Sequence, residues 1–200
     1  MSDTARTKPP ILLGSLLAIL GAIGLWAAFD LTLEKFHVLE HPGSKASCDF
    51  SVVVQCGANL ASWQGSLFGF PNPVIGVICW SVVITIGVAL LARAAFATWF
   101  WIGFNVGVLG ALVFVIWLMG QSIFVLGTLC PWCMVTWAVV IPLFWIVTLN
   151  NLRTGVFPVG QRVRSFADAA YTWIPLITLV CYLVVAIIAQ ARLDVLRYIF

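Results

Sequence analysis

Charged residues are scarce in this sequence. Only 8% of its 200 residues are Asp, Glu, Lys or Arg, whereas soluble domains carry roughly 25%. The formal net charge of +3 is too small to favour a nucleic-acid partner. Hydrophobic residues make up 62% of the chain and the mean hydropathy is +1.10. The composition therefore excludes a soluble domain and indicates an integral membrane protein.

Histidine is equally scarce, which weakens the case for a histidine-based metal site. His37 and His41 are the two histidines of the chain, and both lie in a polar stretch with Glu34, Lys35 and Glu40. We interpret them as surface residues of a solvated connection rather than as metal ligands.

Long apolar runs, in contrast, are abundant. A helix needs about 20 mostly apolar residues to cross a bilayer. Five segments qualify as spans: residues 11–31, 73–92, 98–119, 131–149 and 171–191. None carries a charge near its middle. The first run is too long for a cleavable signal and lacks a clear small-x-small exit, so we expect it to be retained.

The basic residues between the spans predict the orientation. With the N-terminus inside, the cytoplasmic side holds six of the ten basic residues: Arg6, Lys8, Arg93, Arg153, Arg162 and Arg164. The positive-inside rule then places the C-terminus outside. The expected layout is a cytoplasmic N-terminus (residues 1–10), a bundle (11–149) with an outer loop (32–72), a cytoplasmic linker (150–170), a fifth span (171–191) and an extracytoplasmic tail (192–200).

The motif Cys130-Pro131-Trp132-Cys133 begins the fourth predicted span. Two cysteines three residues apart share one face of a helix and can form a reversible disulfide. Proline is preorganised for the first helical position, and the positive end of a helix favours a thiolate. These features indicate thiol–disulfide exchange. Half of a metal site and inert packing in a membrane helix are the alternatives.

Four other cysteines complete the set. In the predicted topology Cys48 and Cys56 lie in the outer loop, on the same membrane face as Cys130 and Cys133. Disulfides persist on that face. Cys79 and Cys181 fall inside spans, where we expect them to pack as small apolar residues.

Three further features bear on the bundle. Gly103, Gly107 and Gly110 form a small-residue strip that predicts close approach of a neighbouring helix. Asn105 in mid-span needs a partner, and an interhelical hydrogen bond is expected. The second half of the outer loop is apolar and is expected to close the bundle as a lid. Its Trp63 belongs either to this lid or to an interfacial aromatic belt.

The combination of motifs resembles the vitamin K epoxide reductase family, specifically its bacterial disulfide-forming members. The matching stretches are Cys48-Asp49 and Cys56, Ser62, Ser66-Leu67-Phe68-Gly69-Phe70-Pro71-Asn72-Pro73 and Cys130-Pro131-Trp132-Cys133, within about residues 11–149. The resemblance implies an all-α integral membrane protein. Four transmembrane helices would enclose a quinone under an extracytoplasmic capping loop, with a fifth transmembrane helix beside them.

The resemblance also implies residue roles. Cys48 would meet the electron donor, Cys56 would exchange with Cys130, and Cys133 would reduce the quinone, of menaquinone or ubiquinone type. Ser62 matches a position close to the redox centre. Asn72 matches an asparagine that can bind a quinone carbonyl, although an asparagine before Pro73 is also a good helix N-cap.

This sequence departs from the family pattern in two respects. Trp137 stands where the vertebrate enzymes place a tyrosine and lacks a phenolic proton, which puts epoxide chemistry in doubt. Many bacterial relatives continue into a fused thioredoxin-like domain, whereas nine residues follow the fifth predicted span here. The implied donor is therefore a separate DsbA-like thioredoxin-fold protein outside the bacterial plasma membrane.

Two alternative functions remain open. One is vitamin K epoxide or quinone reduction in its own right. The other is a non-catalytic membrane protein that binds a metal through four thiolates, although the seven residues between Cys48 and Cys56 do not match the short spacing of closed zinc sites.

Overall fold

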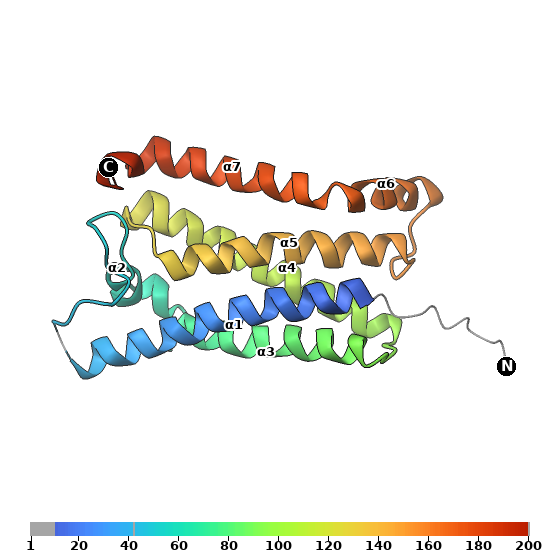
Figure 1. The fold of residues 1–200 in the computed structure, drawn as a ribbon, viewed down its shortest axis with the longest axis horizontal. Coiled ribbons are helices and arrows are strands. Elements are labelled where there is room, and N and C mark those ends of the chain that lie inside the picture. Colours follow the sequence, from blue (N-terminus) through green and yellow to red (C-terminus); the bar gives the residue numbers. More distant parts are fainter. Residues whose placement is uncertain (1–10, 42, 200) are drawn as a thin grey trace.

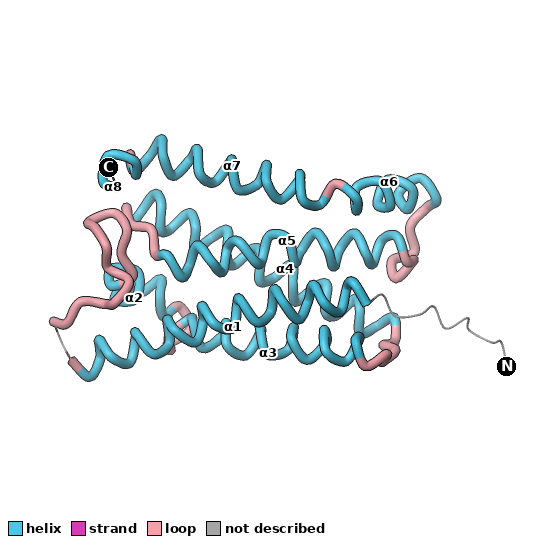
Figure 2. The backbone as a smooth tube through the Cα atoms, viewed as in Figure 1, coloured by secondary structure: helices cyan, strands magenta, loops and turns pink. Residues whose placement is uncertain are grey.

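Five long helices lie roughly side by side in the computed structural model, which describes residues 11–41 and 43–199 (Figure 1). They are α1 (Ile11–Glu40), α3 (Asn72–Leu91), α4 (Thr98–Gly120), α5 (Pro131–Arg153) and α7 (Ile174–Leu193). All five are long and apolar enough to cross a membrane. No strand occurs among the described residues (Figure 2). The predicted all-α integral membrane fold is confirmed.

Short elements lie at the two ends of the bundle. The segment between α1 and α3 contains α2 (Gly57–Ala61) and the 3-10 turn η1 (Trp63–Ser66), and its residues 43–71 are called the cap below. A π-helical turn, η2 (Gln121–Leu126), follows α4 at the cap end, where α8 (Val195–Ile199) also lies. The opposite end carries α6 (Gln161–Thr172), on the right in Figure 1.

The closest helix contact is made by α1 and α3, and glycines make it possible. A Cβ on Gly87 would lie 2.7 Å from the backbone nitrogen of Ala18, and one on Gly14 would lie 2.9 Å from the carbonyl oxygen of Gly87. Any larger side chain there would push the two backbones apart. This contact holds α1 and α3 together as a closely packed pair on one side of the bundle.

The predicted packing strip on α4 is wrong. A Cβ on Gly103, Gly107 or Gly110 would meet nothing within 4 Å, so no neighbouring backbone approaches them. Four-residue spacing places glycines on one face but does not say whether a helix or a cavity lies opposite. Here the three glycines border a cavity.

The expected interhelical partner of Asn105 is present on α5. Asn105 Oδ1 accepts a 3.0 Å hydrogen bond from Asn151 Nδ2, and Asn105 Nδ2 donates to Thr148 Oγ1 at 3.3 Å. Asn151 is completely buried. These bonds tie α4 to α5 inside the apolar interior, where unpaired amides would be costly.

Helix extends into two stretches that the predicted layout places between the spans, the outer loop and the linker. The first helix continues past residue 31 to Glu40, a length of about 45 Å for its 30 residues against a hydrocarbon core of about 30 Å. Its last turns are stabilised by contacts with the cap. The predicted linker 150–170 contains the end of α5 and most of α6, whose buried Ala167 packs into the core. The fifth span begins later than expected, at Ile174, after a break at Trp173.

The two cysteines within spans differ. Cys181 on α7 is half-buried and packs against the main core, as expected. Cys79 does not pack inside the protein: it is exposed on α3 and lines the cavity described below. The α3 face that carries it has no neighbouring helix to cover it.

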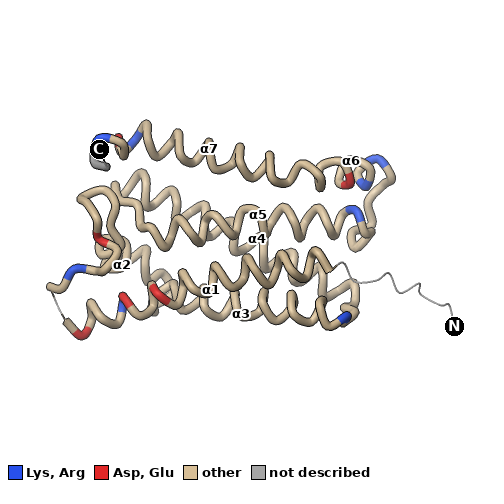
Figure 3. Tube along the Cα trace, viewed as in Figure 1, with Lys and Arg blue, Asp and Glu red and all other residues tan. Residues whose placement is uncertain are grey.

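Charged residues lie at the ends of the bundle and leave its middle apolar (Figure 3). The end opposite the cap carries Arg93, Arg153, Arg162, Arg164 and Asp168 among the described residues. The cap end carries both signs: Lys35, Lys45, Arg192 and Arg197 with Asp30, Glu34, Glu40, Asp49 and Asp194.

Candidate redox site

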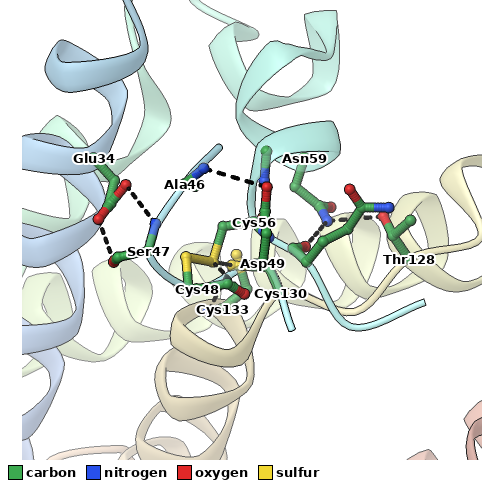
Figure 4. Close-up of a disulfide and its surroundings, with 12 residues drawn as sticks. Glu34, Ala46, Ser47, Cys48, Asp49, Cys56, Asn59, Thr128, Cys130 and Cys133 are labelled. Carbon is green, nitrogen blue, oxygen red and sulfur yellow. Dashed lines mark hydrogen bonds between the residues drawn. A yellow bond between two sulfur atoms is a disulfide. The ribbon is translucent and has the colours of Figure 1, made fainter. Parts of the chain in front are cut away.

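Cys48 and Cys56 form a disulfide in the cap (Figure 4). Their Cα atoms are 5.7 Å apart, within the usual range for such a bond. Cys56 is fully buried and Cys48 is 4% exposed, packed with Leu31, Ala46 and Leu60. A protein partner therefore cannot reach Cys48 directly in this structure, because the first half of the cap packs onto the end of α1.

Asp49 fixes the backbone around this disulfide. Its Oδ1 accepts hydrogen bonds from the backbone N–H groups of Cys56 at 2.7 Å and Gly57 at 2.9 Å, and its Oδ2 accepts one from Ala46 at 3.3 Å. A carboxylate that accepts backbone N–H bonds is strongly held. Asp49 thus closes the loop of seven residues between Cys48 and Cys56 and sets the position of Cys56.

A short backbone pairing brings the cap to the beginning of α5. Val54 and Leu129 form a parallel bridge, in which Leu129 N–H donates to Val53 O at 2.7 Å and Gln55 N–H donates to Leu129 O at 3.0 Å. Since Gln55 precedes Cys56 and Leu129 precedes Cys130, the bridge places these two cysteines side by side. The sequence gives no periodic signal for so short a pairing.

The result is a close approach of Cys130 to the cap disulfide. The Sγ of Cys130 lies 3.4 Å from the Sγ of Cys56, and both residues are completely buried. Cys130 occupies the N-cap position of α5, where its Sγ accepts a 3.3 Å hydrogen bond from the backbone N–H of Cys133. Figure 4 shows Cys130 and Cys133 next to the disulfide. A thiolate at Cys130 would be in van der Waals contact with the disulfide it could attack.

The surroundings of Cys130 favour its thiolate. A hydrogen bond from the Cys133 side chain is the largest influence lowering the pKa of Cys130, and the backbone N–H groups of Cys133 and Trp132 add to it. Burial and the nearby Asp49 carboxylate oppose this effect, but the pKa still lies below the ordinary value of a cysteine thiol.

The C-terminal turns of α1 hold the cap in place. Lys35 Nζ donates a 2.5 Å hydrogen bond to the carbonyl oxygen of Leu60 in α2. Glu34 accepts hydrogen bonds from the backbone N–H and the hydroxyl of Ser47. On the other side, Asn59 Nδ2 donates to Thr128 Oγ1 at 3.0 Å. The cap is therefore bound both to α1 and to the segment that precedes Cys130.

A cavity of about 920 Å³ lies below the cap and reaches Cys130 and Cys133. Apolar side chains of α3, α4 and α5 form most of its wall. Three of the candidate ligand residues, Ser62, Asn72 and Trp137, line it with Cys133. Among the described residues, α3 packs on α1 and α4 packs on α5, whereas α3 and α4 hardly touch each other. The cavity is therefore bordered by lipid-facing residues of both helices.

Asn72 does not act as a helix N-cap. It is the first residue of α3, and the preceding Pro71 makes no side-chain capping bond. The amide of Asn72 instead fastens the cap: its Nδ2 donates to Gln64 O at 2.6 Å and its Oδ1 accepts from Leu67 N–H at 3.1 Å. Asn72 therefore does not serve as the N-cap of α3 but holds the cap segment above the cavity.

Ser62 and Trp63 lie in the cap, whereas Trp137 lies on α5. The Ser62 hydroxyl donates to Asn59 O at 2.7 Å and accepts from Gly65 N–H at 3.2 Å, which caps η1. Trp137 is buried one helical turn after Cys133. Trp63 remains exposed, with its ring 6.0 Å from that of Trp117 on α4, so it belongs to the rim of the cap.

Comparison with protein families identifies this chain's family. The model of the vitamin K epoxide reductase family matches residues 15–148, which include α3, α4 and all four cysteines of the site. No curated protein matches the chain. The matched region covers well over half of the sequence and the whole redox site, and so the chain belongs to the vitamin K epoxide reductase family.

Proposed function

We propose that the protein is a membrane thiol–disulfide oxidoreductase that oxidises a separate thioredoxin-fold thiol oxidase and passes the electrons to a quinone. The observation that carries the proposal is the 3.4 Å separation of Cys130 Sγ from the Cys48–Cys56 disulfide, with Cys133 on the cavity wall. Family membership supports membrane redox chemistry in general.

The exchange steps balance in electrons and protons. A partner dithiol reduces the Cys48–Cys56 disulfide and becomes a disulfide itself. The Cys56 thiolate then attacks Cys130 of an oxidised Cys130–Cys133 pair and releases Cys133. Cys48 next attacks Cys56, which restores the Cys48–Cys56 disulfide and releases Cys130 as a thiolate. The structure corresponds to the state after this step, with Cys130 and Cys133 as free thiols.

The environment of Cys130 suits its place in this order. A thiol of lower pKa is the better leaving group in disulfide exchange. The donors that lower the pKa of Cys130 therefore favour its release from the Cys56–Cys130 bond. The two electrons then reside on the reduced Cys130–Cys133 pair, which borders the cavity.

The cavity fits a quinone ring. Its volume lies within the usual range for small-molecule sites of about 300–1,000 Å³, and its wall is mostly apolar with a few polar groups. When bound, a quinone accepts two electrons and two protons and becomes a hydroquinone, as Cys130 and Cys133 become a disulfide. The glycines of α4 and the open border with α3 leave room for an apolar tail that extends into the bilayer.

The cap also offers a surface to a protein partner. Phe50 and Val52 stand close to Cys48 in the sequence and are 74% and 77% exposed. Exposed apolar side chains beside a buried disulfide are typical of a docking surface. Binding there would have to lift the segment that covers Cys48, since that sulfur is not accessible in the closed cap.

The charge distribution supports an outward-facing cap. The end opposite the cap carries four arginines and a single aspartate among the described residues, which is the pattern of a cytoplasmic end. We therefore place the redox cysteines on the extracytoplasmic side of a bacterial plasma membrane, where a DsbA-like donor would be found.

The decisive experiment uses the purified protein in detergent with a reduced thioredoxin-fold thiol oxidase as donor and menadione as acceptor. We expect menadione reduction that stops in Cys133→Ser. In Cys48→Ser the protein donor should fail, whereas dithiothreitol should still drive slow reduction through Cys56 and Cys130. Full partner oxidation by Cys48→Ser would refute the proposed order of transfer.

The same preparation tests the other two functions. Trp137 lacks the phenolic hydroxyl of the vertebrate enzymes, so we expect the quinone and not the epoxide of vitamin K to be consumed. The Cys48–Cys56 disulfide leaves two free sulfurs at this site rather than the four of a thiolate metal centre, and we expect no stoichiometric zinc in the purified protein.

A further inference from the structure

A pair of glutamine side chains borders the cavity on its cap side. Gln64 belongs to η1 in the cap and Gln121 begins η2 at the end of α4, and both line the cavity. Gln64 Nε2 donates a 3.2 Å hydrogen bond to Gln121 Oε1. Gln64 is 4% exposed, and its Oε1 has no hydrogen-bond partner among the described residues.

The position of Gln64 is fixed by its backbone. Asn72 Nδ2 donates to the Gln64 carbonyl oxygen at 2.6 Å, so the η1 turn cannot rotate away from the end of α3. The side-chain amide, bonded to Gln121, lies at the cavity wall. A buried acceptor without a donor is destabilising, and buried polar atoms are nearly always paired. The unpaired oxygen indicates that a donor from a ligand completes this site.

We propose that the Gln64–Gln121 pair binds a ring oxygen of the quinone substrate and of its hydroquinone product. This inference rests on the proposed function. In the observed arrangement, Gln64 Oε1 is free to accept a hydrogen bond from a hydroquinone hydroxyl. A half-turn of both amides makes Gln121 Nε2 the donor to Gln64 Oε1 and frees Gln64 Nε2 to donate to a quinone carbonyl. One pair thus serves both oxidation states.

The direct test is binding without turnover. In a Cys133→Ser background, menadione is titrated against the quenching of tryptophan fluorescence. Gln64→Met keeps the length and volume of the side chain but removes both polar groups. We expect it to weaken menadione binding about tenfold, the effect of one lost hydrogen bond. Gln161→Met, at the exposed start of α6, is the matched control and should bind like the parent.

A second probe separates a hydrogen bond from a damaged cavity. 2-Methylnaphthalene has the ring system of menadione without its oxygens, and its inhibition constant against menadione reduction should change less than twofold in Gln64→Met. With cysteines intact, the same variant should raise the KM for menadione while its kcat and its KM for the protein donor stay near wild type. Gln121→Met, which also leaves Gln64 without its partner, should weaken menadione binding in the same direction.

The outcomes distinguish the inference from the function on which it rests. Unchanged menadione binding in both Gln64→Met and Gln121→Met, with a wild-type protein that reduces menadione, overturns the inference alone. Equal weakening of menadione and 2-methylnaphthalene also overturns it, since that result indicates a collapsed cavity. A wild-type protein that binds menadione with the expected dependence on Gln64 but does not reduce it refutes the proposed function instead.

Discussion

Cys130 meets a disulfide on one side and a thiol on the other, and both contacts come from its place at the first turn of α5. Its Sγ is 3.4 Å from Cys56 and accepts a bond from the Cys133 backbone. Proline at the next position starts the helix there, so the two cysteines face the cap and the cavity respectively. A substitution at Cys133 therefore affects both the exchange of Cys130 with the cap disulfide and the acidity of the Cys130 thiol.

Removal of Cys133 should trap the internal intermediate. In Cys133→Ser the Cys130 thiolate can attack Cys56 of the Cys48–Cys56 disulfide and release Cys48, and there is no Cys133 thiol to attack Cys130 and reopen the new bond from the cavity side. We expect a Cys56–Cys130 disulfide to accumulate, detected by mass mapping after acid quenching and alkylation. Cys181→Ser, on α7, is the control and should retain the Cys48–Cys56 bond. Exclusive Cys48–Cys56 pairing in Cys133→Ser would contradict the relay.

The acidity of Cys130 should depend on the side chain at position 133. Because the pKa of Cys130 is lowered, its thiolate persists at pH values at which an ordinary thiol is already protonated. It is protonated only when the pH falls below that lowered pKa. Cys133→Ala removes the largest cause of the shift and should move the titration of Cys130 upward, whereas the hydroxyl of Cys133→Ser should preserve part of it. The thiolate absorbance can be followed with Cys48 and Cys56 replaced by serine and a Cys130→Ser variant subtracted. Identical midpoints in the two variants would refute this account.

The sequence predicts which four cysteines form the candidate redox site but not how accessible they are. The Cys130-Pro131-Trp132-Cys133 motif has a local mechanism, and the topology puts Cys48 and Cys56 on the same face. The burial of Cys48 depends on contacts with Leu31 at the end of α1, which no local pattern reveals. The roles of Asp49 and Leu129 likewise arise from hydrogen bonds made after the cap has folded.

Among the elements, the last turns of α1 act as a support for the cap. Lys35→Met should remove the bond to Leu60 O and loosen α2. Because a hydrogen bond from a charged group contributes on the order of 1.5–3 kcal/mol, we expect the Cys48–Cys56 bond to be reduced by dithiothreitol at least several-fold faster. Lys45→Met is the matched control at an exposed cap position. Equal reduction rates in both variants would show that Lys35 does not support the cap.

The glycines of α4 should determine which quinones enter. Gly107→Leu places a side chain in open space beside the cavity, so the fold should tolerate it. We expect the KM for a long-tailed quinone to rise at least tenfold while that for menadione changes little. Gly120→Leu is also unhindered but lies outside the cavity wall, and it should behave like wild type. A similar KM for long and short quinones in Gly107→Leu would place the tail elsewhere.

The spans could be predicted because about 20 apolar residues suffice to specify each of them. The C-terminal end of α1 and the helix α6 could not, since polar turns become helical there through tertiary contacts with the cap and with α5. For a related reason, glycine spacing predicts a close helix contact on α4, whereas the structure has this contact between α1 and α3. Spacing marks a face of a helix, and the fold decides what that face meets.

For the whole molecule, orientation is the property on which the biological setting depends. The arginines at the end opposite the cap predict that the cap and the C-terminal end of α7 lie outside the cytoplasm. A reporter that is active only outside the cytoplasm, fused after Phe200, should be active. A reporter active only in the cytoplasm would invert the topology and remove the rationale for a secreted donor.

The position of the cavity has a bioenergetic consequence. The cap disulfide, the Cys130–Cys133 pair and the amides of Gln64 and Gln121 all lie at one end of the bundle, and among the described residues no charged side chain lies in its middle (Figure 3). Electrons from the donor and the protons that accompany them would be exchanged on the same side of the bilayer. Turnover would then be electroneutral, neither driven nor slowed by the membrane potential, and the protein could oxidise thiols in de-energised cells as long as oxidised quinone remained.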